Sequence, residues 1–240
     1  MNKNKFIIIA LLIFITLPEI SAGQTTNYAV IFDWKTNTYS PLDYGLKIRQ
    51  PIVAGSEIEI WTNLFKTTIS KNQLLYTPQN SENFYYQWFS NGIKFKEGMG
   101  LSKITYSLDR YIKISNFSMG VKVYNDTQLI ADQTINFKLT SPQVVVYEIK
   151  NETSKIAAKV IEASKNEQLR FKAVPYNFTV SSQDLLNFSW YHDNKKIDND
   201  SEILEIKLPN TKTSGFFSVT VRNSKTSLEK ASYTFQVNTK

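Results

Sequence analysis

One histidine and its acidic neighbour are the first residues in this sequence whose types suit catalysis. His192 precedes Asp193, and a serine hydrolase needs a histidine that an acid orients and that contacts a nucleophilic serine. No Gly-x-Ser-x-Gly motif is present to supply that serine. The pair lies in a turn signal between two strand-like stretches. We therefore expect His192 to be a hairpin residue, and we expect the protein not to be an enzyme.

The densest acidic cluster runs from Asp198 to Glu202 and reads DNDSE. Calcium prefers six to eight oxygen ligands, and this cluster would supply some of them. It lacks the glycine and the distal glutamate of an EF-hand, and Lys195 and Lys196 stand beside it. We predict a solvated turn, with a calcium site as the alternative. The chain has one histidine and no cysteine, so we expect no other metal site and no cofactor.

The glycines of KEGMG, Lys96–Gly100, have the Gly-x-Gly spacing of a phosphate-binding loop. Such a loop follows a strand and opens a helix. Here a strand-like stretch follows instead, so the segment predicts a turn.

A cluster of aromatic residues occurs at Tyr85, Tyr86, Trp88 and Phe89. In a strand, alternate side chains point to opposite faces, so Tyr86 and Trp88 share one face. One face of this strand must be core, and exposed aromatic residues on the other would mark an interface. We predict an aromatic contact surface for a protein or a glycan that draws on Tyr85, Tyr86 and Phe89.

The elements that must position these residues are strands. Val, Ile, Phe, Tyr and Thr alternate with polar residues in short segments that turn signals separate, which is typical of half-buried strands. The clearest segments are 28–34, 56–62, 111–117, 120–125, 168–174, 202–208, 216–223 and 233–238. The apolar spacing in 154–168 also suits a short helix, against a strand followed by a loop. The sequence therefore predicts an all-β fold.

Two tryptophans stand in matching surroundings. NFYYQWFSNGIKF contains Trp88, and LNFSWYHDNKKI contains Trp190; each tryptophan follows aromatic residues and precedes a turn and a lysine. MGVKVYN and TINFKL in the first half likewise match FSVTVRN and YTFQV in the second. The chain therefore contains two copies of one domain type, with Pro142 near the boundary. We predict domains at 23–140 and 141–240.

The second half resembles the immunoglobulin-like sandwich family, in which a tryptophan on the third strand fills the space between two sheets. FSWYHDNKKI is similar to the tryptophan strand, and SGFFSVTVRN to the strand that carries the family's Tyr and Cys. Phe217 stands at the Tyr position and Val219 at the Cys position, so neither the disulfide nor the tyrosine corner is expected. The resemblance implies two tandem immunoglobulin-like β-sandwich domains, with Trp88, Trp190, Phe217 and Val219 in their cores.

A narrower resemblance covers the whole chain. FDWKTNTYSPLDYGLKIRQPIVAGSEIEI, YYQWFSNG and LNFSWYHDN resemble a family of exported two-domain proteins with immunoglobulin-like or PKD-like sandwiches from small-genome bacteria. No activity of that family is established. The resemblance implies export and the order of the domains, and it implies no mechanism.

The first residues predict export. Lys3 and Lys5 precede an apolar run, Phe6–Leu17, that ends at Pro18, and small residues follow. This pattern is that of a secretory signal peptide, and the run is shorter than the roughly 20 residues that span a bilayer. We expect a signal peptide over 1–22 and a periplasmic, cell-surface or extracellular protein. The membrane would be contacted only through this segment, if it stays uncleaved.

The charge of the chain excludes one class of partner and favours others. The net charge is +7, without runs of like charge, which favours weak attraction to anionic surfaces and does not suggest nucleic acid. We expect a non-catalytic binding or structural module of the cell envelope or cell surface, with envelope or surface proteins as partners. Alternatives are a carbohydrate-binding or cell-wall-binding module that takes wall glycan, and a two-domain periplasmic chaperone.

Overall fold

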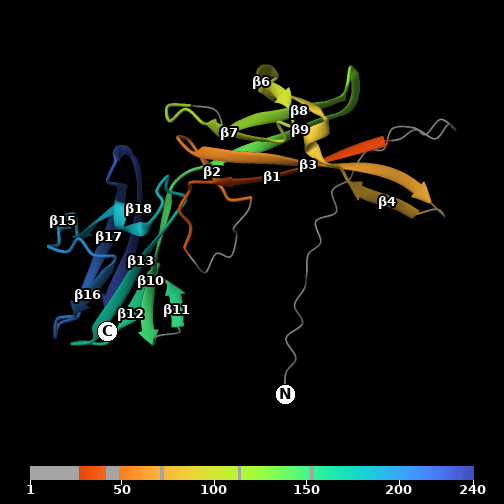
Figure 1. Cartoon of the computed structure of the whole chain (residues 1–240). Coiled ribbons are helices and arrows are strands. Elements are labelled where there is room, and N and C mark those ends of the chain that lie inside the picture. The colour runs from red at the N-terminus through yellow and green to blue at the C-terminus, as the bar shows by residue number, and fades with distance from the viewer. Residues whose placement is uncertain (1–26, 42–48, 71–72, 113–114, 152–153) are drawn as a thin grey trace.

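The computed structural model describes residues 27–41, 49–70, 73–112, 115–151 and 154–240 (Figure 1). The expected signal peptide, 1–22, lies outside the described residues. Within these ranges the chain is built of strands and two short 3₁₀ turns. No helix in the described part has the length and apolar character needed to span a bilayer.

Two sheets of the first half face each other. The first sheet has the order β1–β3–β4, with β7 also paired to β3, and the second has the order β2–β9–β8–β5–β6. The elements are β1 (Asn27–Thr36), β2 (Ile52–Val53), β3 (Glu57–Ser70), β4 (Gln73–Pro78), η2 (Ser81–Asn83), β5 (Tyr85–Ser90), β6 (Ile93–Met99), β7 (Lys103–Ser107), β8 (Asn116–Asn125) and β9 (Gln128–Thr140). Apolar side chains from both sheets form one core between them.

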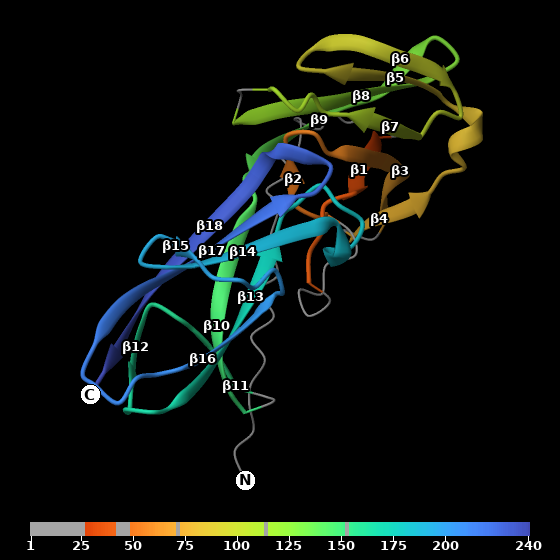
Figure 2. The same ribbon diagram turned by 90° about the vertical axis from the view of Figure 1, so that its left-hand side faces the viewer.

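The second half repeats this arrangement (Figure 2). Its sheets have the orders β11–β10–β13–β16 and β12–β18–β17–β14–β15. The elements are β10 (Gln143–Asn151), β11 (Ser154–Ala157), β12 (Val160–Ala163), β13 (Gln168–Tyr176), η3 (Gln183–Leu185), β14 (Leu186–His192), β15 (Lys195–Lys196), β16 (Ile203–Lys207), β17 (Ser214–Asn223) and β18 (Thr226–Thr239). A second, separate core fills the space between these sheets.

The strand orders of the two five-stranded sheets match position by position. In each, a short strand runs parallel to the last strand, β2 to β9 and β12 to β18, and every other pair is antiparallel. Two layers with this order are the arrangement of an immunoglobulin-like sandwich. The protein is all-β, with two tandem immunoglobulin-like β-sandwiches. The proposed boundary at 140/141 lies between the end of β9 and the start of β10.

Each sandwich is centred on one tryptophan. The side chains of Trp88 and Trp190 are fully buried. The indole Nε1 of Trp88 donates a hydrogen bond to the Leu101 carbonyl at 2.8 Å, and that of Trp190 donates to the Ser201 carbonyl at 2.9 Å. Burying an indole removes about 150–250 Å² from water, and its N–H needs a partner there. The repeated tryptophan therefore has the same packing and the same kind of polar anchor in both copies.

A valine lies opposite each tryptophan on the neighbouring strand. Trp88 pairs with Val121 in β8, and Trp190 pairs with Val219 in β17. Both valines are fully buried, and Phe217 is 7% exposed. Aliphatic side chains thus fill the position at which disulfide-bonded immunoglobulin-like sandwiches have their disulfide. Packing of the two layers takes the place of that covalent link.

Both tryptophan strands end in the same tight turn. Asn91 and Gly92 join β5 to β6 with φ values of 47° and 79°, and Asp193 and Asn194 join β14 to β15 with 46° and 65°. Two positive φ values in a two-residue loop define a type I′ hairpin, which matches the twist of the strands. The first turn residue also binds the next strand: Asn91 Oδ1 accepts from Ser118 N, and Asp193 Oδ1 accepts from Phe216 N, both at 2.9 Å.

Two sequence-based expectations change here. The expected strand at 111–117 is wrong at Tyr111 and Ile112, because Asp109 accepts hydrogen bonds from their amides and makes a turn. Asn116 and Phe117 are extended and belong to β8, whereas residues 113 and 114 lie outside the described residues. The segment 154–168 forms β11 and β12 and the start of β13, so the strand interpretation holds and the helix is excluded.

The hairpin of β3 and β4 extends past the end of the first sandwich (Figure 1). The first part of β3 pairs with β7 and contributes Ile58 and Ile60 to the core, whereas its last part, Phe65–Ser70, pairs with β4. All of β4 is exposed. We call Phe65–Ser70 together with Gln73–Pro78 the arm. Sequence alternation did not reveal it, because neither face of the arm is buried.

One residue of the first sandwich binds the second directly. Tyr39 forms a β-bridge with Phe178: the Tyr39 amide donates to the Phe178 carbonyl at 2.6 Å, and the Asn177 amide donates to the Tyr39 carbonyl at 3.0 Å. The Tyr39 hydroxyl donates to Gln183 Oε1 at 2.9 Å, and its ring packs on the second core. The two sandwiches are therefore joined by more than the connection between β9 and β10.

Candidate functional site

The aromatic residues of β5 divide between the two faces of the strand. Tyr86 and Trp88 are fully buried, whereas Tyr85 and Phe89 point outward and are partly exposed. The prediction of Tyr86 as a contact residue is therefore wrong, because the alternation of β5 turns it into the core. Burial raises the pKa of Tyr86 to about 12. Its hydroxyl has no hydrogen-bond partner in the described part of the chain.

The outward side chains of β5 join those of β6 and β8 in a polar, aromatic network. The rings of Tyr85 and Tyr124 meet edge to face at 6.4 Å. The Tyr124 hydroxyl donates to Gln87 Oε1 at 3.3 Å, and Gln87 Nε2 donates to Glu97 Oε2 at 3.1 Å. Lys94 Nζ lies 2.9 Å from the same Glu97 oxygen. We call the outer surface of β5, β6, β8 and β9 the aromatic face.

The charged groups of this network are stabilised in their ionised forms. The hydrogen bond from Lys94 holds the pKa of the Glu97 carboxyl below its ordinary value, and the same bond raises the pKa of Lys94. The pKa of Tyr85 is raised, mainly because its hydroxyl is partly removed from water and secondly because of its hydrogen bond to Glu97. At neutral pH the face therefore presents the Lys94–Glu97 ion pair beside a protonated Tyr85.

A hollow of about 330 Å³ lies beside this network. Gly120 forms its floor; a Cβ there would lie 3.2 Å from Thr134 Oγ1 and 3.6 Å from Phe89 Cβ. Lys122 Nζ sits 5.6 Å from the centre of the Phe89 ring and 3.4 Å from Asp132 Oδ2. The hollow is lined by Phe89, Gly92, Ser118, Gly120, Lys122, Asp132 and Thr134. A glycine on a strand opens space for a ligand or for another chain to approach closely.

The second sandwich is an internal comparison for this face. Tyr191 occupies the place of Phe89, one residue after the tryptophan, and it pairs with Ser218, where the first sandwich has Gly120. The serine side chain stands where the first sandwich has its glycine floor. The two copies share a backbone and differ at this point of their surfaces.

The same comparison holds along the rest of the face. The Tyr85–Tyr124 pair is replaced by Asn187 and Arg222. The Lys122–Asp132 ion pair is replaced by Thr220 and Ser232, whose hydroxyl oxygens lie 2.9 Å apart. The aromatic and charged surface is thus a property of the first sandwich, and the shared fold does not require it.

His192 is held as a structural residue. Its ring stacks on Phe217 with the centroids 4.4 Å apart, and its Nε2 lies 3.3 Å from Asp193 Oδ2. The other oxygen of Asp193 accepts the Phe216 amide. Gly215 leaves room for the imidazole, because a Cβ there would lie 2.5 Å from Nε2. The histidine and its acid are thus both engaged at the hairpin.

The acidic segment 198–202 forms a turn whose side chains bind protein groups. Asn199 Oδ1 accepts from the Ser201 amide at 2.8 Å, and its Nδ2 donates to the Ile203 carbonyl at 2.8 Å. Glu202 forms an ion pair with Lys172 at 2.9 Å. In the described residues, no three His, Asp or Glu side chains are grouped to hold a metal ion.

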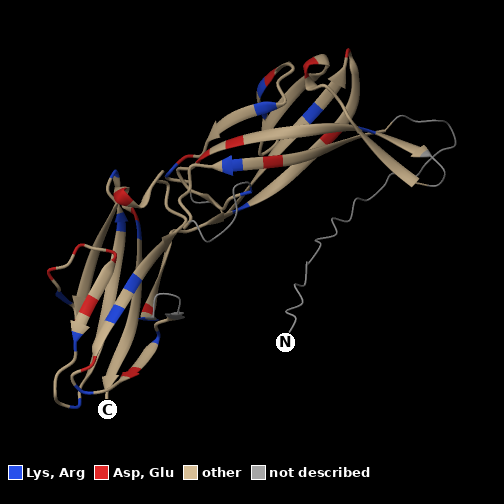
Figure 3. Ribbon diagram, turned by 60° about the horizontal axis from the view of Figure 1, so that its bottom comes forward, with Lys and Arg blue, Asp and Glu red and all other residues tan. Residues whose placement is uncertain are grey.

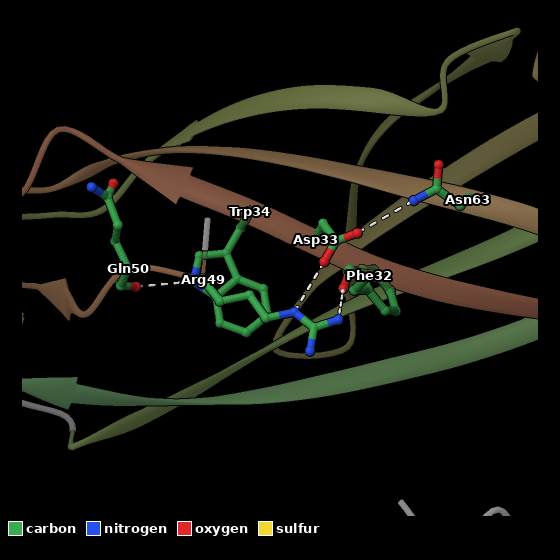
Figure 4. Close-up of polar contacts among 6 residues, drawn as sticks. All are labelled: Phe32, Asp33, Trp34, Arg49, Gln50 and Asn63. Atoms are coloured by element: carbon green, nitrogen blue, oxygen red, sulfur yellow. Dashed lines mark hydrogen bonds and ion pairs between the residues drawn. The ribbon is translucent and has the colours of Figure 1, made fainter. Parts of the chain in front are cut away.

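Trp34 lies in a packed strand, and hydrogen bonds and an ion pair surround it (Figure 4). Trp34 Nε1 donates to the Gln50 carbonyl at 3.0 Å, and its ring contacts Phe137 edge to face at 4.9 Å. Arg49 lies 5.7 Å from the Trp34 ring centre and binds Asp33 Oδ1 at 3.0 Å. These contacts tie the segment before β2 to β1, and they engage the Arg49 guanidinium with both Asp33 and Trp34.

A larger hollow, of about 570 Å³, lies at the ends of β12, β17 and β18. Its polar groups bind one another: Asn238 Nδ2 donates to Glu162 Oε1 and Ser214 Oγ donates to Asn238 Oδ1, both at 2.8 Å. These three lining side chains are therefore paired with one another.

Comparison with known proteins identifies no family. No protein-family model matches the sequence, and no curated protein matches it. A solved structure of three N-terminal domains of the bacteriophage RB49 highly immunogenic outer capsid protein is 14% identical, with a TM-score of 0.43; it covers 88% of this chain, which spans 59% of that structure. Fibronectin(III)-like modules of Clostridium thermocellum CbhA are 14% identical over 86% of this chain and 94% of theirs, with a TM-score of 0.29. The tandem Ig repeats of Dlar are 10% identical over 90% and 99%, with a TM-score of 0.27.

Proposed function

We propose that this chain is an exported, non-catalytic binding protein of the cell envelope or cell surface. Its first sandwich docks a partner protein through the aromatic face. The observation that carries the proposal is the difference between the two copies of the fold: only the first has the tyrosine pair, the glycine floor and the Lys122–Asp132 ion pair. Aromatic residues beside charged groups are typical of interface cores and their rims. Export rests on the N-terminal sequence.

A glycan is the second candidate partner, because the hollow combines the Phe89 ring with hydroxyl and charged groups. Stacking of a sugar needs a free aromatic surface. Lys122 lies over the Phe89 ring, so a sugar must first displace this cation from both Phe89 and Asp132. The face therefore favours a protein partner, whose acidic groups would pair with Lys122 in place.

The test uses a photo-crosslinking amino acid at position 89 of the tagged chain, expressed in its native cells. We expect the group at position 89 to capture one dominant envelope or surface protein. The matched control carries the same group at position 191 of the second sandwich, which should capture none. Equal capture at the two positions, or none at position 89, would contradict the proposed face.

The affinity of variants for the captured partner then measures how much the aromatic face contributes to binding. Replacing both Tyr85 and Phe89 with alanine should weaken binding at least tenfold, since aromatic residues at an interface centre contribute about 2 kcal/mol or more each. Tyr191→Ala should leave binding unchanged. Binding of wall glycan by the wild type and its loss in the double variant would instead support the second candidate.

A further inference from the structure

The arm presents a free strand edge. β4 is the last strand in its sheet order, and no described strand pairs with its outer side. The backbone N–H and C=O groups of such an edge are a template for another strand. Its side chains are apolar and solvent-exposed: Leu74, Leu75 and Tyr76 are 44%, 47% and 48% exposed, and Ile69 across from Leu74 is 62% exposed.

The other strands that end the four sheet orders carry charged residues or are very short. Charged side chains or very short length discourage unwanted pairing at an edge. Charged residues occur in β1, β6, β7, β11, β12, β15 and β16, and β2 has two residues. From Gln73 to Pro78, β4 has no charge, and Figure 3 shows the arm without an acidic residue. Among the described strands that end a sheet order, β4 is therefore the one that has six residues and no charge.

The sequence of β4 is complementary to itself when two copies run antiparallel. With Leu75 opposite Leu75 of the second copy, Leu74 faces Tyr76 and Gln73 faces Thr77, in both directions. Aliphatic–aromatic pairs across strands contribute about 0.2–1 kcal/mol each relative to alanine. We propose that two copies of this chain pair through β4, antiparallel, about a two-fold axis at Leu75.

The C-terminal end of β4 also places Leu75 at the middle of the strand that is available for pairing. The side-chain amide of Gln79 already donates to the carbonyls of Thr77 and Pro78, at 3.0 and 3.2 Å. Pro78 has no N–H to offer, and proline on an edge ends pairing. The strand available for addition is thus Gln73–Thr77, and its middle residue is Leu75.

Charge favours a second copy as the occupant of this edge. In a two-fold contact the residue at the axis faces its own copy, and the other residues face the same short strand, so a strand with like charges repels its copy. β4 avoids this cost because it has no charge, although the whole chain is +7. The aromatic face is on other strands, so pairing leaves it free, and the two contacts can be tested separately.

Sedimentation of the purified chain over a range of concentrations tests the proposal. We expect a monomer–dimer equilibrium, and Leu75→Lys should abolish the dimer by placing two ammonium groups at the axis. Leu228→Lys changes a similarly exposed leucine of β18 (61%) and should leave the dimer intact. Circular dichroism checks that both variants are folded. A wild type that stays monomeric, or a dimer that survives Leu75→Lys, would overturn the proposal.

A cysteine test reports the register, because the natural chain has no cysteine. Residues directly opposite in antiparallel strands have Cβ atoms about 4.5–5.5 Å apart, so Leu75→Cys should form an intermolecular disulfide under mild oxidation. Gln73→Cys is the control: position 73 faces 77, and the two copies of residue 73 would lie about 13 Å apart along the strands. Crosslinking at 73 that equals or exceeds that at 75 would overturn this register.

Discussion

The hydroxyl of Tyr86 is buried without a hydrogen-bond partner among the described residues. A buried polar group in that condition loses its contact with water, which costs about 1–3 kcal/mol. Tyr86→Phe keeps the ring and removes the hydroxyl. We therefore expect this variant to raise the free energy of unfolding by about 1 kcal/mol, measured by urea denaturation. Equal or lower stability would show that the hydroxyl is satisfied.

The advantage of this variant should grow in alkali. The folded protein keeps Tyr86 protonated to about pH 12, whereas an unperturbed tyrosine loses its proton near 10.0. Between these values the unfolded state binds fewer protons, so the wild type loses stability as the pH rises. Tyr86→Phe lacks this titration. The difference between their urea midpoints should therefore widen from pH 10 to pH 12, and the other tyrosines should cancel in the comparison.

For single residues, the sequence predicted which side chains lie in strands and turns better than it predicted which of them form the candidate site. Alternation alone placed Tyr86 beside Trp88 on the core face, yet its aromatic ring suggested a contact residue. The importance of Gly120 and Lys122 was not predicted, because a glycine floor and a cation over a ring depend on two neighbouring strands in register. His192 was correctly expected in a hairpin, since its neighbours form a turn signal.

Among the elements, the two type I′ turns allow a matched test. Gly92 has φ +79° and no heavy atom within 4 Å of a would-be Cβ, so Gly92→Ala reports backbone strain alone. A non-glycine residue in this conformation costs about 1–2 kcal/mol. We expect Gly92→Ala to destabilise the protein by about 1 kcal/mol in urea denaturation.

Asn194 is the matched position of the second sandwich, and its replacement by glycine should not lower the free energy of unfolding. Asn194 has φ 65°, so Asn194→Gly relieves a small strain and should leave stability equal or slightly higher. A loss of stability in Asn194→Gly as large as in Gly92→Ala would show that side-chain contacts, and not φ, govern these turns.

Strands with one buried face were predictable, because burial imposes period-two alternation on the sequence. β5, β14 and β17 carry that signal clearly. β4 and the end of β3 do not, since both faces of the arm meet solvent, and nothing in the sequence pattern separates an exposed hairpin from a loop. The turn at Asp109 was missed for a related reason: the alternation around it continued although the strand had not begun.

At the scale of the whole molecule, we expect the contact of Tyr39 with Phe178 to fix the orientation of one sandwich relative to the other. The receiving segment is itself fixed, because the Thr179 amide and hydroxyl both donate to the buried carboxylate of Glu229, at 2.6 and 2.7 Å. A rigid contact on both sides should hold the sandwiches in one relative orientation. This bridge joins residues far apart in the sequence, which no local pattern predicts.

Removing the bridge should free the two sandwiches from each other. Tyr39→Pro loses the amide that donates to Phe178 and the ring that packs on the second core, whereas Tyr39→Phe loses only the bond to Gln183. We expect separate rotational correlation times for the two sandwiches in Tyr39→Pro, measured by ¹⁵N relaxation. A common value should persist in Tyr39→Phe. One common value in both variants would show that the connection between β9 and β10 is stiff by itself.

The parallel pairing at the end of each sandwich decides how the chain responds to pulling. β12 runs parallel to β18 over four residue pairs, and β2 runs parallel to β9 over two. Tension between the points where the chain enters and leaves a sandwich acts along these strands, so their hydrogen bonds are sheared together and not opened one after another. The first sandwich has half as many parallel residue pairs to break as the second. It should therefore unfold at a lower force, and extend while the second sandwich is still folded.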